Sequence, residues 1–398
     1  MLTESRRSEE NRKPTPRRVA IVCTHPIQYH SPTFRALAQE SELDIKVFYG
    51  WEGPGKSIDH GFGRAVEWDI PLLDGYEYEF IENVSKNPGS HRFRGIDLPS
   101  LNSKIRTWNA DAVLVYGWCY KAHLNALRYF KNRIPVLFRG DSTLLNQSGG
   151  IKSLLRKHFL SWVYSHIDIA LFVGSHNREY FLAHGMSQKQ LIFSPHAIDN
   201  SRFAAPESEV AGLELRRLYG IEDDEVVVLL PAKLEPIKNP EILIEAFRSI
   251  DHPRCHLVFA GSGPLESKLR SMAGDRTHFL GFKNQTEMPA VYYMADLIAL
   301  TSRSETWGLV LNEAMACGRA IIASNTVGAA IDLITPSVNG WVFNEGNLDS
   351  LIGILNSATR EGRLALKTKG NQSRMRVDDW SIQNQVAGML SVFQKIVV

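Results

Sequence analysis

Two glutamates in the segment 301–324, TSRSETWGLVLNEAMACGRAIIAS, are spaced for binding one long ligand. On a single straight helix, Glu305 and Glu313 would lie about 80° and roughly 12 Å apart, too far for a paired acid and base. We therefore expect Glu305 in a loop and Glu313 inside a helix that begins near Gly308. The start of that helix would offer unpaired amides, at Gly308 and Leu309, to an anion. The alternative is an amphipathic helix with solvated glutamates.

Three further loops of the second half carry chemistry suited to phosphate or ribose, and each follows an apolar run. PAKLEPIKN (231–239) places Lys233 and Lys238 where two ammonium groups could neutralise a diphosphate. AGSGP (260–264) contains Gly261 and Gly263, which permit close backbone approach, and LGF (280–282) ends at Phe282. Exposed lysines and an ordinary tight turn remain the alternatives for single loops. Together, the four loops predict a nucleotide-diphosphate site.

The elements that must position these loops form two series of alternating strands and helices. The first series has predicted strands at 19–24, 44–50, 112–117, 134–140 and 168–174, and the second at 226–232, 256–261, 277–282, 296–302 and 319–324. Alternation of this kind predicts parallel sheets with helices on both faces. Residues 194–212 look like a linker between the series, and 381–396 look helical. Ligands of such sheets bind at the carboxyl ends of the strands.

Composition excludes several other classes of protein. The 398 residues carry 45 basic and 43 acidic side chains, and this near-neutral balance disfavours a nucleic-acid binder. No apolar run is long enough to span a membrane. Four scattered cysteines favour neither a zinc site nor a disulfide framework, so we expect a cytoplasmic protein. The basic segment 1–18 is either a solvated, disordered tail or a weak contact with the inner face of an anionic membrane.

The motifs resemble those of the family 4, or group 1, glycosyltransferases. PAKLEPIKNPEILIEAF, FAGSGPLESKL, FLGF, SETWGLVLNEAMACGRAIIAS and VGAAIDLITPSVNGWVF follow the order and spacing of that family, and the resemblance covers about 170–350. It implies the GT-B fold, α/β with two facing Rossmann-like doubly wound domains and a cleft between them. We expect an acceptor-binding domain over 19–200 plus the terminal helix 381–398, and a donor-binding domain over 201–380.

The resemblance also implies a role for each donor-side residue. Glu313 would hold the ribose hydroxyls, and Glu305 would bind hydroxyls of the donor sugar. The lysine pair would clamp the diphosphate of a nucleotide-sugar and stabilise the leaving group without a metal or cofactor. Retention of anomeric configuration is implied as well. The remaining donor-side residues are Gly261, Gly263, Phe282, Thr306, Trp307, Gly308 and Leu309.

The chain departs from the family pattern at several positions. Lys233 stands where the family usually has Arg, and Asn239 where Gly is common. Lysine keeps the charge but loses bidentate phosphate geometry. In the first half, THPIQYHSPTFRAL (24–37) replaces a glycine pair and FRGDST (138–143) replaces a histidine motif.

Those two first-half loops are where we place the acceptor. Asp141 could orient or deprotonate an acceptor hydroxyl, and His30 could hydrogen-bond it. The alternatives are a turn aspartate and a structural histidine. The other acceptor-side candidates are His25, Ser31 and Arg139. Aromatic residues of 51–93, including Trp51, Phe62 and Trp68, either stack on sugar rings or anchor a long loop.

The sequence therefore predicts a retaining, metal-independent glycosyltransferase with a saccharide or lipid-linked acceptor. Two other readings stay open: a GT-B sugar epimerase or phosphorylase, and a non-catalytic nucleotide-sugar-binding protein. The sugar, the nucleobase, the acceptor and the oligomeric state are left undetermined.

Overall fold

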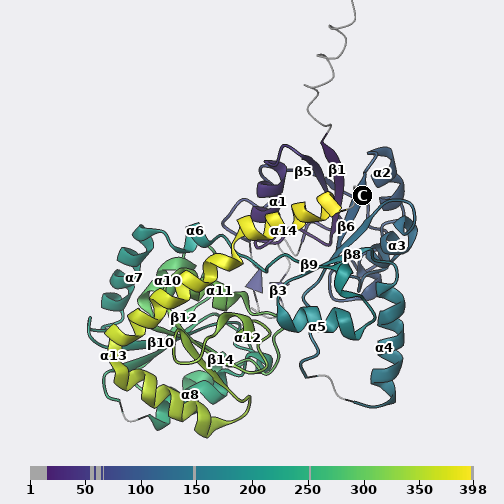
Figure 1. Ribbon diagram of the computed structural model, residues 1–398. Helices are drawn as coiled ribbons and strands as arrows, with labels where there is room; N and C mark the ends of the chain where they lie inside the picture. Colours follow the sequence, from purple (N-terminus) through teal and green to yellow (C-terminus); the bar gives the residue numbers. More distant parts are fainter. Residues whose placement is uncertain are drawn as a thin grey trace, which may run out of the picture.

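The computed structural model describes residues 16–53, 58–59, 64–65, 67–146, 149–250 and 252–395. It contains two parallel sheets, each covered by helices on both faces (Figure 1). This arrangement confirms the predicted class of two α/β domains. Most of the predicted basic tail, and Phe62, lie outside the described residues. In the part of the chain that is described, no helix is both long and apolar enough to cross a bilayer.

The first sheet has seven parallel strands in the order β5-β2-β1-β6-β7-β8-β9. Its strands are β1 (Arg17–Cys23), β2 (Leu43–Tyr49), β5 (Glu77–Phe80), β6 (Ala112–Tyr116), β7 (Val136–Arg139), β8 (Ile169–Phe172) and β9 (Leu191–Phe193). Its helices are α1 (Ser31–Ala38), α2 (Leu101–Thr107), α3 (Lys121–Phe130), α4 (Ile151–Tyr164) and α5 (Ser175–Ala183). A separate antiparallel pair consists of β3 (Ile58–Asp59) and β4 (Arg64–Ala65).

The second sheet has six parallel strands in the order β12-β11-β10-β13-β14-β15. Its strands are β10 (Val226–Pro231), β11 (Cys255–Ala260), β12 (Thr277–Gly281), β13 (Leu297–Leu300), β14 (Ala320–Ser324) and β15 (Gly340–Phe343). Its helices are α6 (Asn200–Phe203), α7 (Pro206–Leu218), α8 (Pro240–Ser249), α9 (Glu266–Met272), α10 (Met288–Met294), α11 (Leu309–Ala316), α12 (Ala330–Leu333) and α13 (Leu348–Val377), which is kinked at Gly362.

Alternating side chains of each central strand enter opposite cores, which explains the nearly all-apolar strand sequences. In β1, Ala20 and Val22 pack under α2 to α5, whereas Ile21 and Cys23 pack toward α1. In β10, all six residues are buried. Both faces of each sheet are thus committed to packing, and only the loops at the strand ends remain for ligands.

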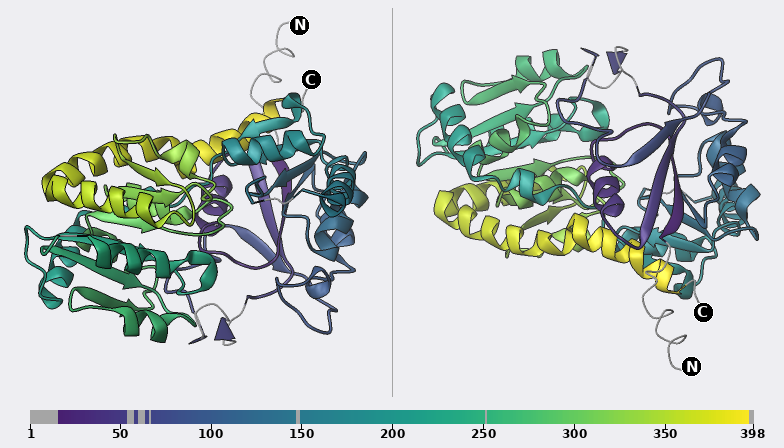
Figure 2. Two further views of the ribbon diagram at one scale, coloured as in Figure 1. Left: turned by 90° about the horizontal axis from the view of Figure 1, so that it is seen from below. Right: turned by 90° about the horizontal axis from the view of Figure 1, so that it is seen from above.

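The final helix, α14 (Ile382–Lys395), leaves the second domain and packs on the first (Figure 2). Val386, Met389 and Val392 join the same core as Ile21 and lie on the α1 side of the first sheet. The two domains are therefore connected at 194–200 and again through α14.

The linker predicted over 194–212 was wrong in its second part. Helices α6 and α7 occupy most of it, and Pro206 supplies the first turn of α7. The turn-like and charged residues of this segment gave no apolar pattern typical of a helix, because the buried residues of α7 are a glycine and an arginine. Gly212 packs directly on α10, and Arg216 is fully buried.

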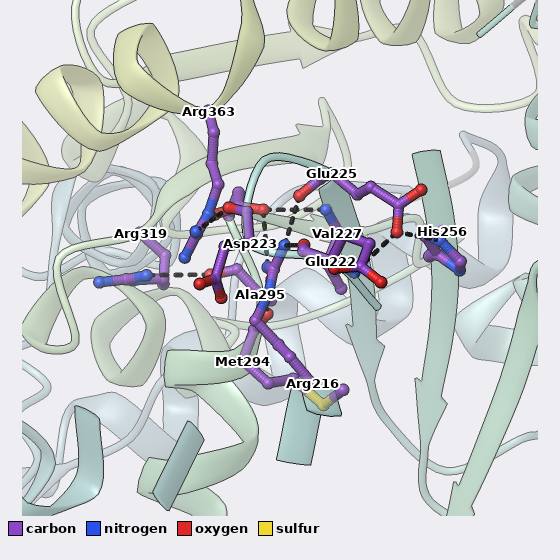
Figure 3. A network of polar contacts seen from close by, with 11 residues as sticks. Arg216, Glu222, Asp223, Glu225, Val227, His256, Met294, Ala295, Arg319 and Arg363 are labelled. Carbon is purple, nitrogen blue, oxygen red and sulfur yellow. Dashed lines mark hydrogen bonds and ion pairs between the residues drawn. The ribbon is translucent and has the colours of Figure 1, made fainter. Parts of the chain in front are cut away.

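Arg216 anchors α7 to the amino-terminal edge of the second sheet (Figure 3). Its guanidinium donates to the carbonyls of Met294, Glu222 and Glu225 and to the Asp296 carboxylate at 3.1 Å. Asp296 also accepts from Arg363 Nε at 2.8 Å and from the amide of Val227 at 2.9 Å. This network lies at the edge opposite the loops that carry the predicted site.

Candidate functional site

A cavity of about 430 Å³ lies between the two domains and is called here the Glu313 cavity. Both domains contribute to it. The first domain supplies Gln28, Tyr29 and Trp68, and the second supplies the ends of β10, β11 and β12 together with α10 and α11. Of the predicted residues, it is lined by Lys233, Lys238, Gly261, Phe282 and Glu313. Parallel strands that end at the same edge of the sheet bring these loops together.

Glu313 lies inside α11 and is almost completely buried, with 3% of its surface exposed. Tyr29 Oη donates to its Oε1 at 3.0 Å, and Tyr292 Oη donates to its Oε2 at 2.5 Å. Burial raises the pKa of the Glu313 carboxyl above its usual value, although both phenols act in the opposite direction. A buried carboxylate that accepts hydroxyl donors on both oxygens is suited to binding a diol.

The two predicted lysines border the same cavity. Lys238 ends a short turn before α8, and its ammonium forms an ion pair with Glu305. Ser302 Oγ also donates to Glu305, at 3.5 Å. Lys233 and a third lysine, Lys283, line the cavity as well. Three lysines therefore border the Glu313 cavity beside one further glutamate, Glu235, and Lys283 is paired with Glu287. Ammonium groups at this place are suited to a diphosphate.

The two glycines after β11 let the loops stack closely. A Cβ on Gly261 would lie 2.0 Å from the carbonyl oxygen of Ala232, and one on Gly263 would lie 2.5 Å from that of Leu234. Gly261 also adopts φ of +145°. Gly263 does not line the cavity, so its role in the structure is to seat the Lys233 loop. Phe282 lies 6.5 Å from Trp68 of the first domain, measured between ring centres.

None of the four predicted residues of segment 306–309 lines the Glu313 cavity. Thr306 Oγ1 donates to Asp141 Oδ2 at 2.8 Å. The Trp307 indole is buried and donates to Asn312 Oδ1 at 2.9 Å. Gly308 has φ of +98°, and a Cβ there would contact Val327, while Leu309 begins α11. Thr306 and Trp307 thus contact the first domain, whereas Gly308 and Leu309 form the start of the helix that carries Glu313.

A second cavity of about 320 Å³, called here the His30 cavity, lies at the carboxyl edge of the first sheet. Of the predicted residues, Asp141, His30 and Arg139 line it; His196, Tyr116 and Tyr120 line it as well and were not singled out from the sequence. His30 Nδ1 and Tyr116 Oη are buried there without a hydrogen-bond partner. Such atoms are suited to a hydroxylated ligand, because a buried polar atom without a partner is costly.

Both histidines of this cavity are held in the neutral form. Burial, together with the nearby His196 and Arg139, lowers the pKa of His30 well below its usual value. Burial, and then Arg139, lowers the pKa of His196 to about 3. Neutral imidazoles can orient a hydroxyl but are weak bases here, and Asp141 is the only carboxylate among the residues lining this cavity.

Three predicted acceptor-side residues have structural partners. Arg139 is buried and donates to the carbonyl oxygens of Ser194 and Pro195, both at 2.8 Å, so it fixes the domain connection. Ser31 is buried and donates to the carbonyl of Ile27 at 3.2 Å. His25 Nδ1 lies 2.9 Å from Thr24 Oγ1, and its ring packs edge-on against Trp51. Neither Ser31 nor His25 lines either cavity.

Sequence reasoning missed Tyr29, Tyr292 and His196. Tyr29 lies within the quoted THPIQYH segment, but only the fold shows that it crosses to Glu313. Tyr292 lies in an apolar helix, where a buried tyrosine looks like ordinary core. His196 follows β9, a three-residue strand that was not predicted. Within the described residues, no three His, Cys, Asp or Glu side chains are arranged to hold a metal ion.

The chain is similar to known proteins both in sequence and in structure. Residues 213–374 match the family model described as glycosyl transferases group 1. An uncharacterised glycosyltransferase of Methanocaldococcus jannaschii is 34% identical over 231 residues, which are 55% of this chain and 58% of that protein. A GDP-mannose-dependent alpha-(1-6)-phosphatidylinositol monomannoside mannosyltransferase of Mycolicibacterium smegmatis is 28% identical over 227 residues, 54% of this chain and 58% of that protein. The matched region thus spans little more than half of these relatives.

Solved structures share the architecture over nearly the whole chain. Anabaena HepE in complex with UDP superposes with a TM-score of 0.72 at 17% identity and covers 95% of this chain and 100% of its own. Sucrose-phosphate synthase from Thermosynechococcus elongatus also gives 0.72 at 17% identity, with 96% and 99% covered. These likenesses confirm the predicted fold of two facing parallel-sheet domains.

Proposed function

We propose that the protein moves a sugar from a nucleotide-diphosphate sugar to an acceptor hydroxyl with retention of configuration and without a metal, and the match of residues 213–374 to the group 1 glycosyl transferases supports this proposal. The observation that carries the proposal is one cavity lined by a buried carboxylate and by lysines, Glu313 with Lys233 and Lys238. A ribose diol and a diphosphate are neighbouring parts of one nucleotide-sugar, and the cavity offers a suitable partner to each.

In the proposed reaction, Glu313 holds the ribose and the lysines stabilise the diphosphate as it leaves. Fixed positive charge beside a leaving group stabilises the charge that develops in the transition state. Glu305, positioned by Lys238, contacts hydroxyls of the donor sugar. The leaving phosphate and the acceptor hydroxyl lie on the same face of the sugar, so the phosphate takes up the acceptor proton.

The acceptor hydroxyl is proposed to enter through the His30 cavity. Asp141 contacts Thr306, one residue from Glu305, so this cavity adjoins the sugar-binding loop. His30 and Tyr116 would orient the hydroxyl through atoms that have no protein partner. The lining is polar and carries one carboxylate, Asp141, and one guanidinium, Arg139; such a lining suits the hydroxyls of a saccharide, whether free or linked to a lipid.

The proposal is tested by incubating the protein with UDP- and GDP-linked sugars and candidate saccharide or lipid-linked acceptors. The expected result is release of nucleoside diphosphate that depends on the acceptor, unchanged by EDTA, with the anomeric configuration of the product retained in its proton NMR spectrum. An isomerised sugar nucleotide formed without acceptor would instead identify an epimerase, and phosphate-dependent release of a sugar phosphate a phosphorylase. Binding without turnover would identify a non-catalytic protein.

Lys238→Ala should lower the turnover rate by about 100- to 1,000-fold, the usual effect of removing one group that stabilises transition-state charge. Lys268→Ala is the matched control, because Lys268 is an exposed lysine of the same domain that also pairs with a glutamate, Glu241. Equal turnover in the two variants would contradict the assignment of Lys238.

A further inference from the structure

Trp68 belongs to the first domain but lines the Glu313 cavity, most of which is built by the second domain. The side chain is half-buried. Its ring centre lies 6.5 Å from that of Phe282, and the two ring planes make an angle of 45°. Phe282 directly follows β12. The indole of Trp68 therefore lies where the two domains meet, at the β12 end of the cavity.

The strand order of the second sheet indicates which part of a nucleotide-sugar would lie at this end. Along the sheet edge, β12 is followed by β11, then by β10 with Lys233 and Lys238 after it, and then by β13, which precedes Glu305. Neighbouring strands are about 4.8 Å apart, so β12 and β13 are about 14 Å apart. If the sugar lies at Glu305 and the diphosphate at the lysines, the base lies at the end of β12.

The lining at the β12 end suits a flat heteroaromatic group. Met288 and Tyr292 of α10 are one turn apart, and both line the cavity. Because Tyr292 donates to Glu313, the proposed partner of the ribose, a base attached to that ribose comes within reach of Met288. The other lining residues at this end are Trp68, Phe282, Lys283 and Gln285. Aromatic and thioether side chains pack well on the face of a base.

Trp68 is held in place through the residues on both sides of it in the chain. The Asp69 carboxylate accepts from the amide of Thr286 at 3.2 Å and from its hydroxyl. The carbonyl oxygen of Glu67 accepts from Asn284 Nδ2 at 2.8 Å. Both donors belong to the loop between β12 and α10. Residues Glu67, Trp68 and Asp69 are called here the Trp68 clasp, because they join the two domains beside the cavity.

The loop that receives the Trp68 clasp has partners of its own in the second domain. Arg202 of α6 donates to the carbonyl oxygen of Gln285 at 2.7 Å and to its Oε1 at 2.8 Å. Glu287 accepts from the amide of Asn284 at 3.0 Å and pairs with Lys283 at 3.0 Å. The loop can therefore hold Trp68 in one place without a ligand, so less conformational freedom is lost when a base binds.

We propose that Trp68 stacks on the nucleobase of the donor, an inference that rests on the proposed function because it takes a nucleotide-sugar as the ligand of the Glu313 cavity. The base also contacts Phe282 and Met288 of the second domain. The first domain then takes part in recognising the nucleotide, and the Trp68 clasp positions the ring that does so. Bound nucleotide in turn strengthens the contact between the domains.

The test is isothermal titration of the wild type, Trp68→Ala and Trp68→Phe with UDP and GDP. Trp68→Ala should bind both nucleotides about 5- to 150-fold more weakly, the usual effect of removing an aromatic ring that stacks on a base. Trp68→Phe keeps a ring and should recover most of the affinity. Trp162→Ala is the matched control, because Trp162 is a tryptophan of the same domain that is 42% exposed and lines neither cavity.

Two further measurements separate stacking from a purely structural role. Pyrophosphate carries the diphosphate without a base, so its affinity should be the same for the wild type and Trp68→Ala. Asp69→Ala leaves the ring intact but removes the acceptor of Thr286. In this variant UDP should dissociate about 2- to 10-fold faster in stopped-flow measurements, the effect of losing one net hydrogen bond, while thermal unfolding is unchanged.

Trp68→Ala that binds UDP and GDP like the wild type would overturn the inference, and so would equal losses of affinity for UDP and pyrophosphate. Turnover that falls without any loss of nucleotide affinity would do the same, since Trp68 would then contact the sugar or the acceptor. In these cases acceptor-dependent transfer by the wild type leaves the proposed function intact. Nucleotide binding that depends on Trp68 in a protein that transfers no sugar supports stacking and refutes the proposed function. A wild type that binds neither nucleotide would overturn both.

Discussion

Replacing Glu313 by Gln changes the charge of the larger cavity with almost no change of shape. Both carboxylate oxygens accept from phenols, Oε1 from Tyr29 and Oε2 from Tyr292. A glutamine keeps one acceptor oxygen and turns an amide donor toward the other phenol, whose oxygen can accept. The fold should therefore tolerate the substitution.

The expected loss of nucleotide affinity follows from the hydrogen bonds that the carboxylate would make to ribose hydroxyls. A hydrogen bond to a charged group contributes about 1.5–3 kcal/mol. Losing one such bond weakens binding by roughly 10- to 150-fold, because about 1.4 kcal/mol corresponds to a factor of ten. The assay is isothermal titration with UDP and GDP, with Glu266→Gln as the control, since Glu266 is a glutamate of the same domain that pairs with Arg270 outside the cavity.

The pH dependence gives a second, independent signature of the same group. Burial raises the pKa of Glu313, so on acidification the carboxylate is lost at a higher pH than for an ordinary glutamate. Nucleotide affinity should fall as the pH drops through that raised pKa in the wild type, and this component should be missing in Glu313→Gln. Unchanged affinity in the variant, or an identical pH profile in both proteins, would refute the assignment of the ribose to Glu313.

Three further predictions concern stability. Arg216→Met should lower the free energy of unfolding by about 3–5 kcal/mol in a denaturant titration, because it leaves Asp296 buried with a weakened set of partners; a loss below about 1 kcal/mol would contradict the role of the network. Asn239→Ala should cost about 1–2 kcal/mol and Asn239→Gly little, since φ is +49° there; equal losses would show that the backbone conformation is not the cause. The pKa of His196 is lowered to about 3 in the folded protein, so on acidification the unfolded chain binds a proton at this histidine first. The free energy of unfolding should therefore fall by at most about 1.4 kcal/mol per pH unit below pH 6.5. His196→Asn should reduce this pH dependence in thermal unfolding, and an unchanged pH dependence would contradict the burial of a neutral His196.

The strands and the loops at their ends could be predicted because both sheets are parallel and buried on both faces. VAIVC and VVVLLP are apolar throughout, and this pattern leaves little choice of structure. Motifs placed after such runs then fall at one edge of the sheet, which is how Lys233, Lys238 and Glu313 come to surround one cavity. Asn239, which stands where the family commonly has Gly, can also be explained, because asparagine tolerates the left-handed backbone conformation that this position adopts.

The first-domain side could not be predicted to the same depth, because contacts there depend on tertiary structure rather than on spacing. Arg139 follows a strand as a ligand-binding residue would, yet its guanidinium is used by carbonyls more than 50 residues away. Tyr29 and Glu313 are 284 residues apart, and no local pattern connects them. Helix α7 was missed since its buried face consists largely of an arginine and a glycine rather than an apolar stripe.

The loop between β1 and α1 contributes residues to both cavities. Gln28 and Tyr29 line the Glu313 cavity, whereas Thr24, Ile27 and His30 line the His30 cavity. If a ribose hydroxyl replaced Tyr29 as the donor to Glu313 Oε1, Tyr29, the neighbour of His30 in the chain, would move. If the ribose instead used the remaining lone pairs of the carboxylate, Tyr29 and His30 would stay in place. In the first case the coupling must be reciprocal, so an acceptor that fixes His30 would change nucleotide affinity by the same factor that the nucleotide changes acceptor affinity. Because Tyr29 and His30 are consecutive residues, a substrate that displaces one of them in its cavity can change the affinity of the other cavity for the second substrate.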